Sequence, residues 1–262
     1  MTRVGFVGAG RMGGPMVRRL AEAGHDVRAF GRTPEKCRAI EELGAQAVTD
    51  ATGVAKGADV VIVCVFTDVQ VRQVCLDGDL VAAMAPDAVL VIHTTGSPRT
   101  AAAIAAQGVE VVDAPVSGGP HDIAAGHVTL FVGGTDDAIG RVRPVLSAYG
   151  DPILYVGSSG AGQLVKLVNN TLFAAQIGVV AEGVRLAGRL GIPESVLLEA
   201  LTHGSAGSRA LGNITRAGSA TAFIDAVGDF IGKDVAVART IIAELGGDLG
   251  VLDDLADAGL KP

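Results

Sequence analysis

A lysine on an apolar helix and a glycine-rich loop are the residues of this sequence whose types and spacing could do chemistry. Lys166 stands four residues before Asn170, so a helix places both side chains on one face. Gly8, Gly10 and Gly13 follow a short apolar run in the order G-x-G-x-x-G, which lets a backbone turn tightly around a pyrophosphate. A lysine ammonium can protonate a carbonyl oxygen while a bound nicotinamide gives hydride. Together the two features predict hydride transfer assisted by a lysine.

The glycine loop needs a strand before it and a helix after it, and the first part of the chain supplies both. Short, continuously apolar runs alternate with helical stretches such as Met12–Ala23 and Pro34–Leu43, as in a parallel sheet buried on both faces. This alternation predicts an α/β fold with an N-terminal, doubly wound Rossmann sheet. The predicted strands are Val4–Val7, Asp26–Phe30, Val60–Phe66, Val89–Ile92, Val109–Val112 and Thr129–Val132.

The pattern becomes helical near Gly160. From Gln163 to Leu190 there is no proline and no strand signal, and apolar residues recur at helical spacing until Gly191 and Pro193 end the helix. Further helices are predicted over Pro193–Thr202, Ser208–Ala217 and Phe230–Leu245. We therefore predict an NADP-binding Rossmann domain of residues 1–160. A long interdomain helix joins it to an all-α domain of residues 161–262, expected to serve substrate binding and oligomerisation.

Composition excludes several classes of protein. A hydrophobic fraction of 49% against 19% charged residues allows a large core and excludes disorder. A net charge of −7 disfavours a nucleic-acid partner, which needs clustered basic residues. No uninterrupted apolar stretch is long enough to span a membrane, and because the chain opens directly on a strand, no signal peptide is expected. The 3 cysteines lack metal-binding spacing, so free thiols in a reducing cytoplasm, and no metal site, are expected.

The end of the second predicted strand indicates which dinucleotide binds. An NAD site places Asp or Glu here for the ribose hydroxyl, but this chain has Gly31 followed by Arg32. A guanidinium can clamp a 2′-phosphate with two hydrogen bonds, and Thr33 and Lys36 are close by. NADP(H) is therefore predicted over NAD(H); the alternative is that Arg32 is an ordinary surface charge. The predicted contacts of the glycine loop are Gly8, Ala9, Gly10, Arg11, Met12 and Gly13.

With these motifs in view, the chain resembles the β-hydroxyacid dehydrogenase family, which includes 3-hydroxyisobutyrate dehydrogenases and tartronate semialdehyde reductases. The matching segments occur in the same order as in the family and are Gly5–Met16, Asp113–Gly119, Gly160–Lys166 with Asn170, and Lys233-Asp234. The resemblance implies an oxidoreductase that moves a hydride between NADP(H) and a small β-hydroxy acid or semialdehyde acid. Phosphogluconate dehydrogenases share the NAD-binding motifs but need a far larger helical domain.

The resemblance also implies roles for individual residues. Lys166 would be the general acid/base, and Asn170 would hold the substrate or the lysine. Ser117, Gly118 and Gly119 would bind the substrate carboxylate through hydroxyl and backbone N–H groups. Further cofactor contacts would come from Val65, Phe66, Thr67, Thr95 and Lys233.

The segment after Gly119 departs from the family pattern. Asp122 and Ile123 replace the usual Gly-Ala, and His127 replaces a threonine. His121 and Asp122 either alter substrate preference or are exposed loop residues. The physiological substrate is left open by these differences.

Two other functions are compatible with this fold. Imine reductases resemble the family but usually carry Asp or Tyr where this chain has Lys166. A non-catalytic NADP-binding protein would be expected to lose that lysine. The long apolar helix also favours a homodimer or homotetramer assembled through the helical domain.

Overall fold

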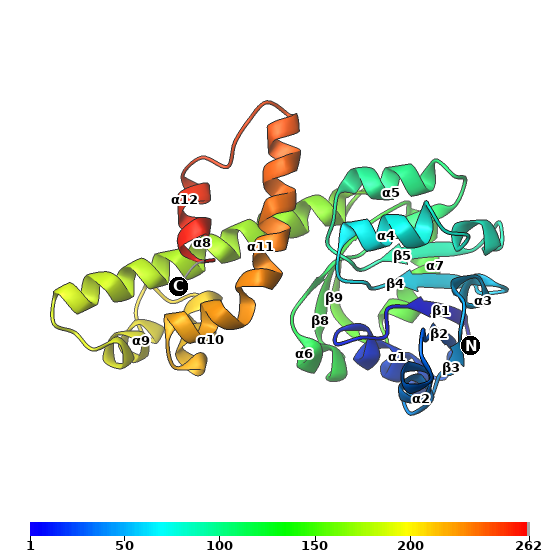
Figure 1. The fold of residues 1–262 in the computed structure, drawn as a ribbon, viewed down its shortest axis with the longest axis horizontal. Coiled ribbons are helices and arrows are strands. Elements are labelled where there is room, and N and C mark those ends of the chain that lie inside the picture. The colour runs from blue at the N-terminus through cyan, green and yellow to red at the C-terminus, as the bar shows by residue number, and fades with distance from the viewer. Residues whose placement is uncertain (261–262) are drawn as a thin grey trace. The chain divides into compact units, whose positions relative to one another are not determined.

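The computed structural model describes residues 1–260, and the chain divides into two compact units. The first unit is Met1–Lys166, a sheet with helices packed on its two faces (Figure 1). The second begins at Leu167, and its described residues form helices joined by loops, with no strand among them. The predicted α/β fold with an N-terminal Rossmann sheet and a C-terminal helical domain is confirmed.

The sheet of the first unit has the strand order of a dinucleotide-binding fold. Its strands are β1 (Arg3–Val7), β2 (Asp26–Phe30), β3 (Gln46–Val48), β4 (Val60–Val63), β5 (Val89–Ile92), β6 (Glu110–Asp113), β7 (Val116–Ser117), β8 (Val128–Gly133) and β9 (Gly150–Gly157). The order β3-β2-β1-β4-β5-β6 is parallel throughout, and it reverses between β1 and β4. Ligands of such sheets bind beyond the carboxyl ends of the strands at this reversal.

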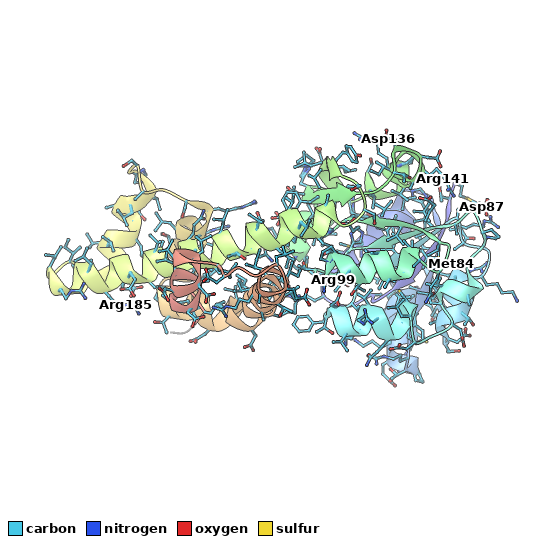
Figure 2. The ribbon with its side chains drawn as sticks, turned by 90° about the horizontal axis from the view of Figure 1, so that it is seen from above. Met84, Asp87, Arg99, Asp136, Arg141 and Arg185 are labelled. Carbon is cyan, nitrogen blue, oxygen red and sulfur yellow. The ribbon has the colours of Figure 1, made fainter. Side chains whose placement is uncertain are left out.

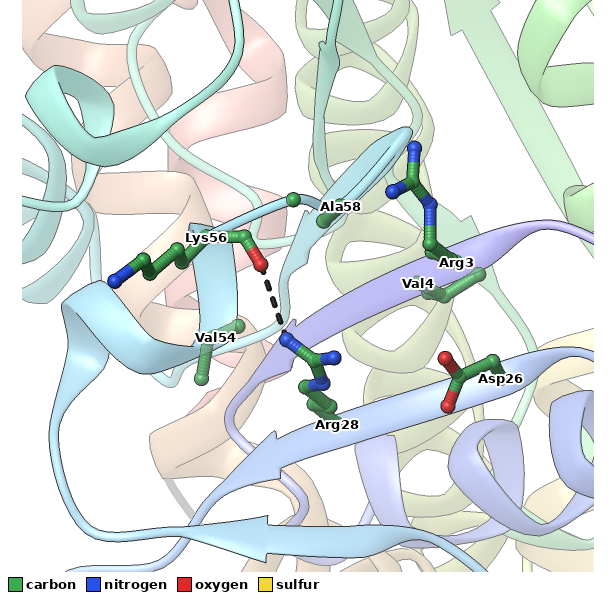
Figure 3. Close-up of a pocket in the computed structure, with 8 residues that line it drawn as sticks. Arg3, Val4, Asp26, Arg28, Val54, Lys56 and Ala58 are labelled. Carbon is green, nitrogen blue, oxygen red and sulfur yellow. Dashed lines mark hydrogen bonds between the residues drawn. The ribbon is translucent and has the colours of Figure 1, made fainter.

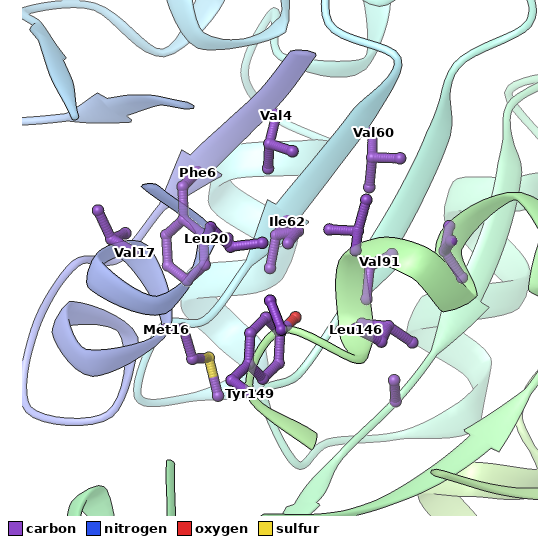
Figure 4. Packing of buried hydrophobic residues seen from close by; sticks show 14 of the residues in the cluster. Val4, Phe6, Met16, Val17, Leu20, Val60, Ile62, Val91, Leu146 and Tyr149 are labelled. Carbon is purple, nitrogen blue, oxygen red and sulfur yellow. The ribbon is translucent and has the colours of Figure 1, made fainter. Parts of the chain in front are cut away.

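Helices cover both faces of the sheet, so each face has its own apolar core. The helices of this unit are α1 (Gly13–Glu22), α2 (Pro34–Glu41), α3 (Ala51–Ala55), α4 (Asp68–Cys75), α5 (Pro98–Ala105), α6 (Pro120–Ala124) and α7 (Asp136–Leu146), with a short 3₁₀ turn at Val81–Ala83. Phe6, Met16, Ile62 and Tyr149 pack in the core beneath α1, α2, α6 and α7 (Figure 4). A second core lies beneath α3, α4 and α5. Burial on both faces explains why these strands are continuously apolar.

Differences from the predicted strands occur where burial is incomplete. β3, β7 and β9 were not predicted, and β9 is mostly exposed and contains Asp151 and Pro152, so it lacks an apolar run. The predicted strand Val60–Phe66 was too long, because β4 ends at Val63. Beyond it, Thr67 and Gln70 form a capping box that begins α4 and turns the chain out of the sheet.

The second unit packs four helices against most of the length of a long one. These are α8 (Ala161–Arg189), which begins in the first unit, and α9 (Glu194–Thr202), α10 (Arg209–Ala217), α11 (Ala220–Glu244) and α12 (Val251–Ala258). Ile177, Leu211 and Ile231 belong to their shared core. At Gly178 a Cβ would lie 2.0 Å from the carbonyl oxygen of Leu255, so glycine lets α8 and α12 approach closely. α11 begins earlier than the predicted Phe230–Leu245 helix, with Ser219 as its cap.

Within the described residues, α8 is long and apolar enough to cross a membrane by length and composition. This is weak evidence, because a helix that runs through a protein core passes the same test. Of its most apolar window, 56% is buried against the rest of the protein.

Candidate active site

The loop between β1 and α1 has the geometry that a dinucleotide-binding turn requires. Gly8 has a φ of 103°, and a Cβ there would lie 2.2 Å from the carbonyl oxygen of Cys64. A Cβ at Gly13 would lie 2.2 Å from the Gly8 carbonyl oxygen, so helix and strand approach closely. Apart from its two chain neighbours, no residue places a heavy atom within 4 Å of the Cβ position of Gly10. The loop thus leaves space where a pyrophosphate would approach the backbone.

The N-terminus of α1 differs from those of the helices that follow neighbouring strands. α2, α4, α5 and α7 begin with a threonine or serine whose hydroxyl accepts a first-turn N–H. α1 has neither a side-chain cap nor an acidic residue in its first turn. An uncapped first turn leaves N–H groups for an anion, which the helix dipole also attracts. This end of α1 therefore fits a dinucleotide pyrophosphate, and Ala9, Arg11 and Met12 lie in the turn that leads into it.

The end of β2 is followed by exposed positive side chains and by a glycine that has little space for a side chain. Arg32 and Lys36 are exposed, and Thr33 caps α2 by accepting the Lys36 N–H at 3.3 Å. Gly31 is buried, and a Cβ there would lie 2.9 Å from Cys37 Sγ and 3.0 Å from the Cys37 nitrogen. An acidic side chain of the kind that binds an NAD ribose therefore has no room at position 31.

The loops after β4 and β5 are joined by hydrogen bonds. The Thr94 hydroxyl accepts the Val65 N–H and donates to the Val65 carbonyl oxygen, both at 2.9 Å. Phe66 is 56% exposed beside them, and the half-buried Thr95 follows Thr94 directly. Thr67 is the cap of α4, so its hydroxyl already accepts the Gln70 N–H. These predicted cofactor contacts lie at one edge of the sheet, because β4 and β5 are parallel.

A buried carboxylate and a buried amide fix the start of α8 to that edge. Asp113, at the end of β6, accepts the Gly160 N–H at 2.6 Å and the Gln163 N–H at 2.7 Å. Burial raises the pKa of the Asp113 carboxyl above its usual value, although the N–H groups oppose this. The Gln163 amide donates to the Thr94 carbonyl oxygen and accepts the Gly96 N–H, both at 2.9 Å. The helix that carries Lys166 is therefore anchored to the loop that contains Thr95.

The predicted carboxylate-binding segment lies beside the same edge. Ser117 is the last residue of β7 and pairs with Thr129 of β8. Gly118 has a φ of 141°, a conformation that favours glycine. The Gly119 N–H, predicted to meet the substrate, donates to Oδ2 of Asp122 at 2.6 Å. One of the predicted substrate donors thus already has an acceptor within the chain.

Lys166 and Asn170 both lie on α8 with buried side chains, 6% and 4% exposed respectively. The Asn170 amide donates to Oδ2 of Asp234 at 2.5 Å, and Lys233 forms an ion pair with the other carboxylate oxygen. Asp234 is fully buried. Asn170 and Lys233 are therefore brought together in the second unit through Asp234, a carboxylate for which the sequence motifs predict no role.

Comparison with known proteins identifies the family of this chain. Residues 3–157 match the model of the NAD-binding domain of 6-phosphogluconate dehydrogenase. Residues 160–256 match that of the NAD-binding domain of NADP-dependent 3-hydroxyisobutyrate dehydrogenase. A Pseudomonas aeruginosa 3-hydroxyisobutyrate dehydrogenase is 38% identical over 216 residues, 80% of this chain and 72% of that protein. The chain belongs to the β-hydroxyacid dehydrogenase family. The resemblance drawn from its motifs is confirmed.

Other members of the β-hydroxyacid dehydrogenase family match over similar lengths. A P. aeruginosa NAD-dependent L-serine dehydrogenase is 36% identical over 80% of this chain and 72% of its own. The solved structure of Mycobacterium tuberculosis 3-hydroxyisobutyrate dehydrogenase with L-serine has a TM-score of 0.87 at 30% identity. The match covers 98% of this chain and 92% of that one. NAD(P)-binding domains and hydroxyacid dehydrogenase chemistry are thus shared features of this chain and its relatives.

In this family member a buried histidine joins the β5 loop to the chain before Ser117. His93 Nδ1 lies 2.5 Å from the Ala114 carbonyl oxygen, and Nε2 lies 2.8 Å from the Tyr149 hydroxyl. A carbonyl oxygen only accepts, so Nδ1 carries the proton and Nε2 accepts from Tyr149. Burial lowers the pKa of His93 to about 4. The histidine is therefore neutral in the folded protein near neutral pH.

Acidification should destabilise the protein through His93. The His93 side chain takes up a proton near pH 6.5 in the unfolded chain and near pH 4 in the folded chain. Its contribution to the free energy of unfolding is therefore fully present above pH 6.5 and is lost as the pH falls from 6.5 to 4. The loss is about 1.4 kcal/mol per pH unit, about 3 kcal/mol in total. His93→Gln should flatten this slope in urea unfolding measured across the window, whereas His203→Gln, at an exposed position, should not. Equal slopes in all three proteins would contradict the assignment.

A small pocket lies at the opposite edge of the sheet (Figure 3). Its volume is about 10 Å³, and Arg28 crosses it to donate to the Lys56 carbonyl oxygen at 3.0 Å. This is room for about one water molecule. Residues at its rim, Arg3 and Asp26, begin β1 and β2, so it lies away from the glycine loop. Among residues 1–260, no group of three His, Cys, Asp or Glu side chains is placed to hold a metal.

Proposed function

We propose that this protein is an NADP(H)-dependent dehydrogenase that interconverts a small β-hydroxy acid and the corresponding semialdehyde acid, with Lys166 as general acid/base. The observation that carries the proposal is the anchoring of α8. Through Gln163, the helix bearing Lys166 is hydrogen-bonded to the backbone on both sides of Thr95. A proton donor and a predicted cofactor contact are thereby held on one rigid assembly, as catalysis by orientation requires.

The proposed reaction needs one proton transfer from the protein. A bound nicotinamide cofactor supplies or accepts the hydride. During reduction, the Lys166 ammonium gives a proton from Nζ to the carbonyl oxygen as its carbon becomes a C–H centre. During oxidation, the neutral amine takes the hydroxyl proton. The ammonium also stabilises negative charge on the oxygen, an effect strengthened by the burial of Lys166.

The residues that follow β2 fit NADP(H) better than NAD(H). Arg32 and Lys36 are exposed cations at the end of β2, where the adenosine ribose of a dinucleotide lies in this fold. The position that carries an acid in NAD enzymes is the closed glycine Gly31. A 2′-phosphate would find charged donors here, whereas a free ribose hydroxyl would find no carboxylate.

Replacing Arg32 with alanine should weaken NADPH binding about 10- to 100-fold, the value of one or two charge-assisted hydrogen bonds. NADH binding should change little. Titration of each cofactor by fluorescence measures both constants. Arg38→Ala is the matched control, because Arg38 lies on the same helix and pairs with Glu35 at 3.3 Å. A clear preference of the unaltered protein for NADH would contradict the NADP assignment.

The proposed activity is tested by following NADPH oxidation with glyoxylate, succinic semialdehyde, methylmalonate semialdehyde, tartronate semialdehyde and a cyclic imine. Oxidation by an aldehyde acid that is lost in Lys166→Ala supports the proposal. Turnover of the imine alone would indicate an imine reductase instead. Tight NADPH binding without turnover of any compound would indicate a non-catalytic member of the fold.

We also propose that the protein forms a homodimer or homotetramer through its helical domain. Val168, Leu172, Val179 and Leu186 on α8 are each at least 44% exposed in the single chain. These positions repeat at helical spacing, so they form an apolar stripe of the kind that subunits bury. Light scattering measures the mass in solution, and a monomer would contradict the proposal.

The reducing cytoplasm is the proposed compartment. Cys37, Cys64 and Cys75 are free thiols, and no nucleic-acid or membrane partner is part of the proposal. Burial raises the pKa values of the half-buried Cys64 and the fully buried Cys75 to about 12, so both thiols are unreactive near neutral pH. Cell fractionation tests the location.

A further inference from the structure

The segment expected to bind the substrate carboxylate contains a carboxylate of its own. Asp122 Oδ2 accepts the Gly119 N–H at 2.6 Å, a short, charge-assisted hydrogen bond. The same oxygen lies 2.7 Å from the place where a Cβ of Gly118 would be. The other carboxylate oxygen lies 3.2 Å from His121 Nε2. Asp122 therefore lies directly against the glycine pair.

Asp122 is held in this position by the fold. Gly119 is the cap of α6, and Asp122 takes the place in its first turn from which a side chain reaches back to the cap. Ile123, the next residue, is fully buried in the core beneath α1 and fixes α6 against the sheet. The Asp122 side chain is 26% exposed, whereas His121 is 81% exposed. The negative charge is thus a fixed part of the loop and is only partly covered by an exposed histidine.

We infer that Asp122 is a specificity-determining residue that selects against purely anionic substrates and in favour of substrates bearing an ammonium group. The inference rests on the proposed function and on the expectation, drawn from the family resemblance, that this loop binds the substrate carboxylate. Compared with a loop that lacks Asp122, this loop offers a substrate carboxylate one free N–H group fewer and places one additional negative charge beside it. The favoured class is a zwitterionic β-hydroxy amino acid, because its ammonium offsets the repulsion between the two carboxylates.

The size of the effect follows from Coulomb's law. Two unit charges about 4 Å apart change an equilibrium constant about fivefold in bulk water and up to about 10³-fold near a protein surface, so a tenfold effect lies at the low end of this range. The effect depends on the net charge that the substrate brings to the loop. A zwitterion brings a net charge of zero to Asp122, whereas a hydroxy monocarboxylate brings an uncompensated negative charge.

The test compares L-serine with 3-hydroxypropionate, which differ by the ammonium group on the second carbon. The ratio of their kcat/KM values is measured in the unaltered protein and in Asp122→Asn. Asparagine keeps an oxygen that accepts the Gly119 N–H, so the cap is retained while the charge is removed. Asp87→Asn is the control, because Asp87 is an exposed acid before the amino end of β5, at the opposite edge of the sheet (Figure 2).

Asp122→Asn should shift the ratio about tenfold towards 3-hydroxypropionate, and Asp87→Asn should leave it unchanged. An unchanged ratio in Asp122→Asn, or an equal loss for both compounds, would overturn the inference and leave Asp122 as a helix cap. If the enzyme reduces aldehyde acids but oxidises neither compound, their inhibition constants give the same ratio. The absence of any dehydrogenase activity would contradict the proposed function itself, and this outcome is distinct from an unchanged ratio in an active enzyme.

Discussion

Lys166→Ala should lower kcat about 10²- to 10⁴-fold, the contribution of a positioned general acid/base, while NADPH binds as before. The side chain is buried on α8 and three residues beyond Gln163, whose amide anchors the helix. Removing it takes away the proton donor and the positive charge near the reacting oxygen. Steady-state reduction of the best aldehyde acid measures kcat, and cofactor titration measures NADPH binding.

Two further variants make the Lys166 prediction specific. Lys166→Arg keeps the positive charge but holds its protons too tightly to donate them, so most of the loss in kcat should persist. Lys56→Ala removes an exposed lysine at the opposite edge of the sheet and should leave turnover unchanged. Near-normal turnover in Lys166→Ala would refute the catalytic role.

Asp113→Ala should destabilise the first unit by about 2–5 kcal/mol, because two buried N–H groups at the start of α8 lose their acceptor. Turnover should fall as well, since the helix that carries Lys166 is no longer tied to the end of β6. Urea unfolding measures the stability. Asp113→Asn retains one acceptor oxygen, so its loss of stability should be smaller.

Asp136→Ala provides a matched comparison for Asp113. Asp136 is an exposed acid in the first turn of α7, so its loss should cost about 0.5 kcal/mol or less (Figure 2). A loss of similar size in Asp113→Ala would show that the carboxylate does not hold α8. A large loss of stability with unchanged kcat in the remaining folded protein would separate the structural role from the positioning of Lys166.

The central strands of the sheet could be predicted from the sequence because burial on both faces makes them continuously apolar. β1 and β5 match the predicted ranges to within a residue. β9 could not be predicted in this way, because only its partner β8 gives its exposed residues a place in the sheet. The long helix α8 was predictable for a different reason, because no proline interrupts its sequence.

The candidate site was predictable where a local motif carries the function. The glycine loop is such a case, since Gly8 and Gly13 act within one turn. Asp113 and Asp234 were not assigned roles, because their partners Gly160 and Asn170 are 47 and 64 residues away. Contacts across such separations are set by the packing of the fold. For Asp122, the sequence leaves two interpretations open and does not reveal the hydrogen bond to Gly119.

The lack of space for a side chain at Gly31 has a consequence for protein engineering. A single substitution that introduces an acid there meets both the sulfur and the backbone of Cys37, so trimming the cysteine alone still leaves its nitrogen 3.0 Å away. A side chain at position 31 is therefore accommodated only if the start of α2 gives way by a few tenths of an ångström. A library aimed at introducing an acid at the end of β2 should therefore vary the start of α2 together with residue 31.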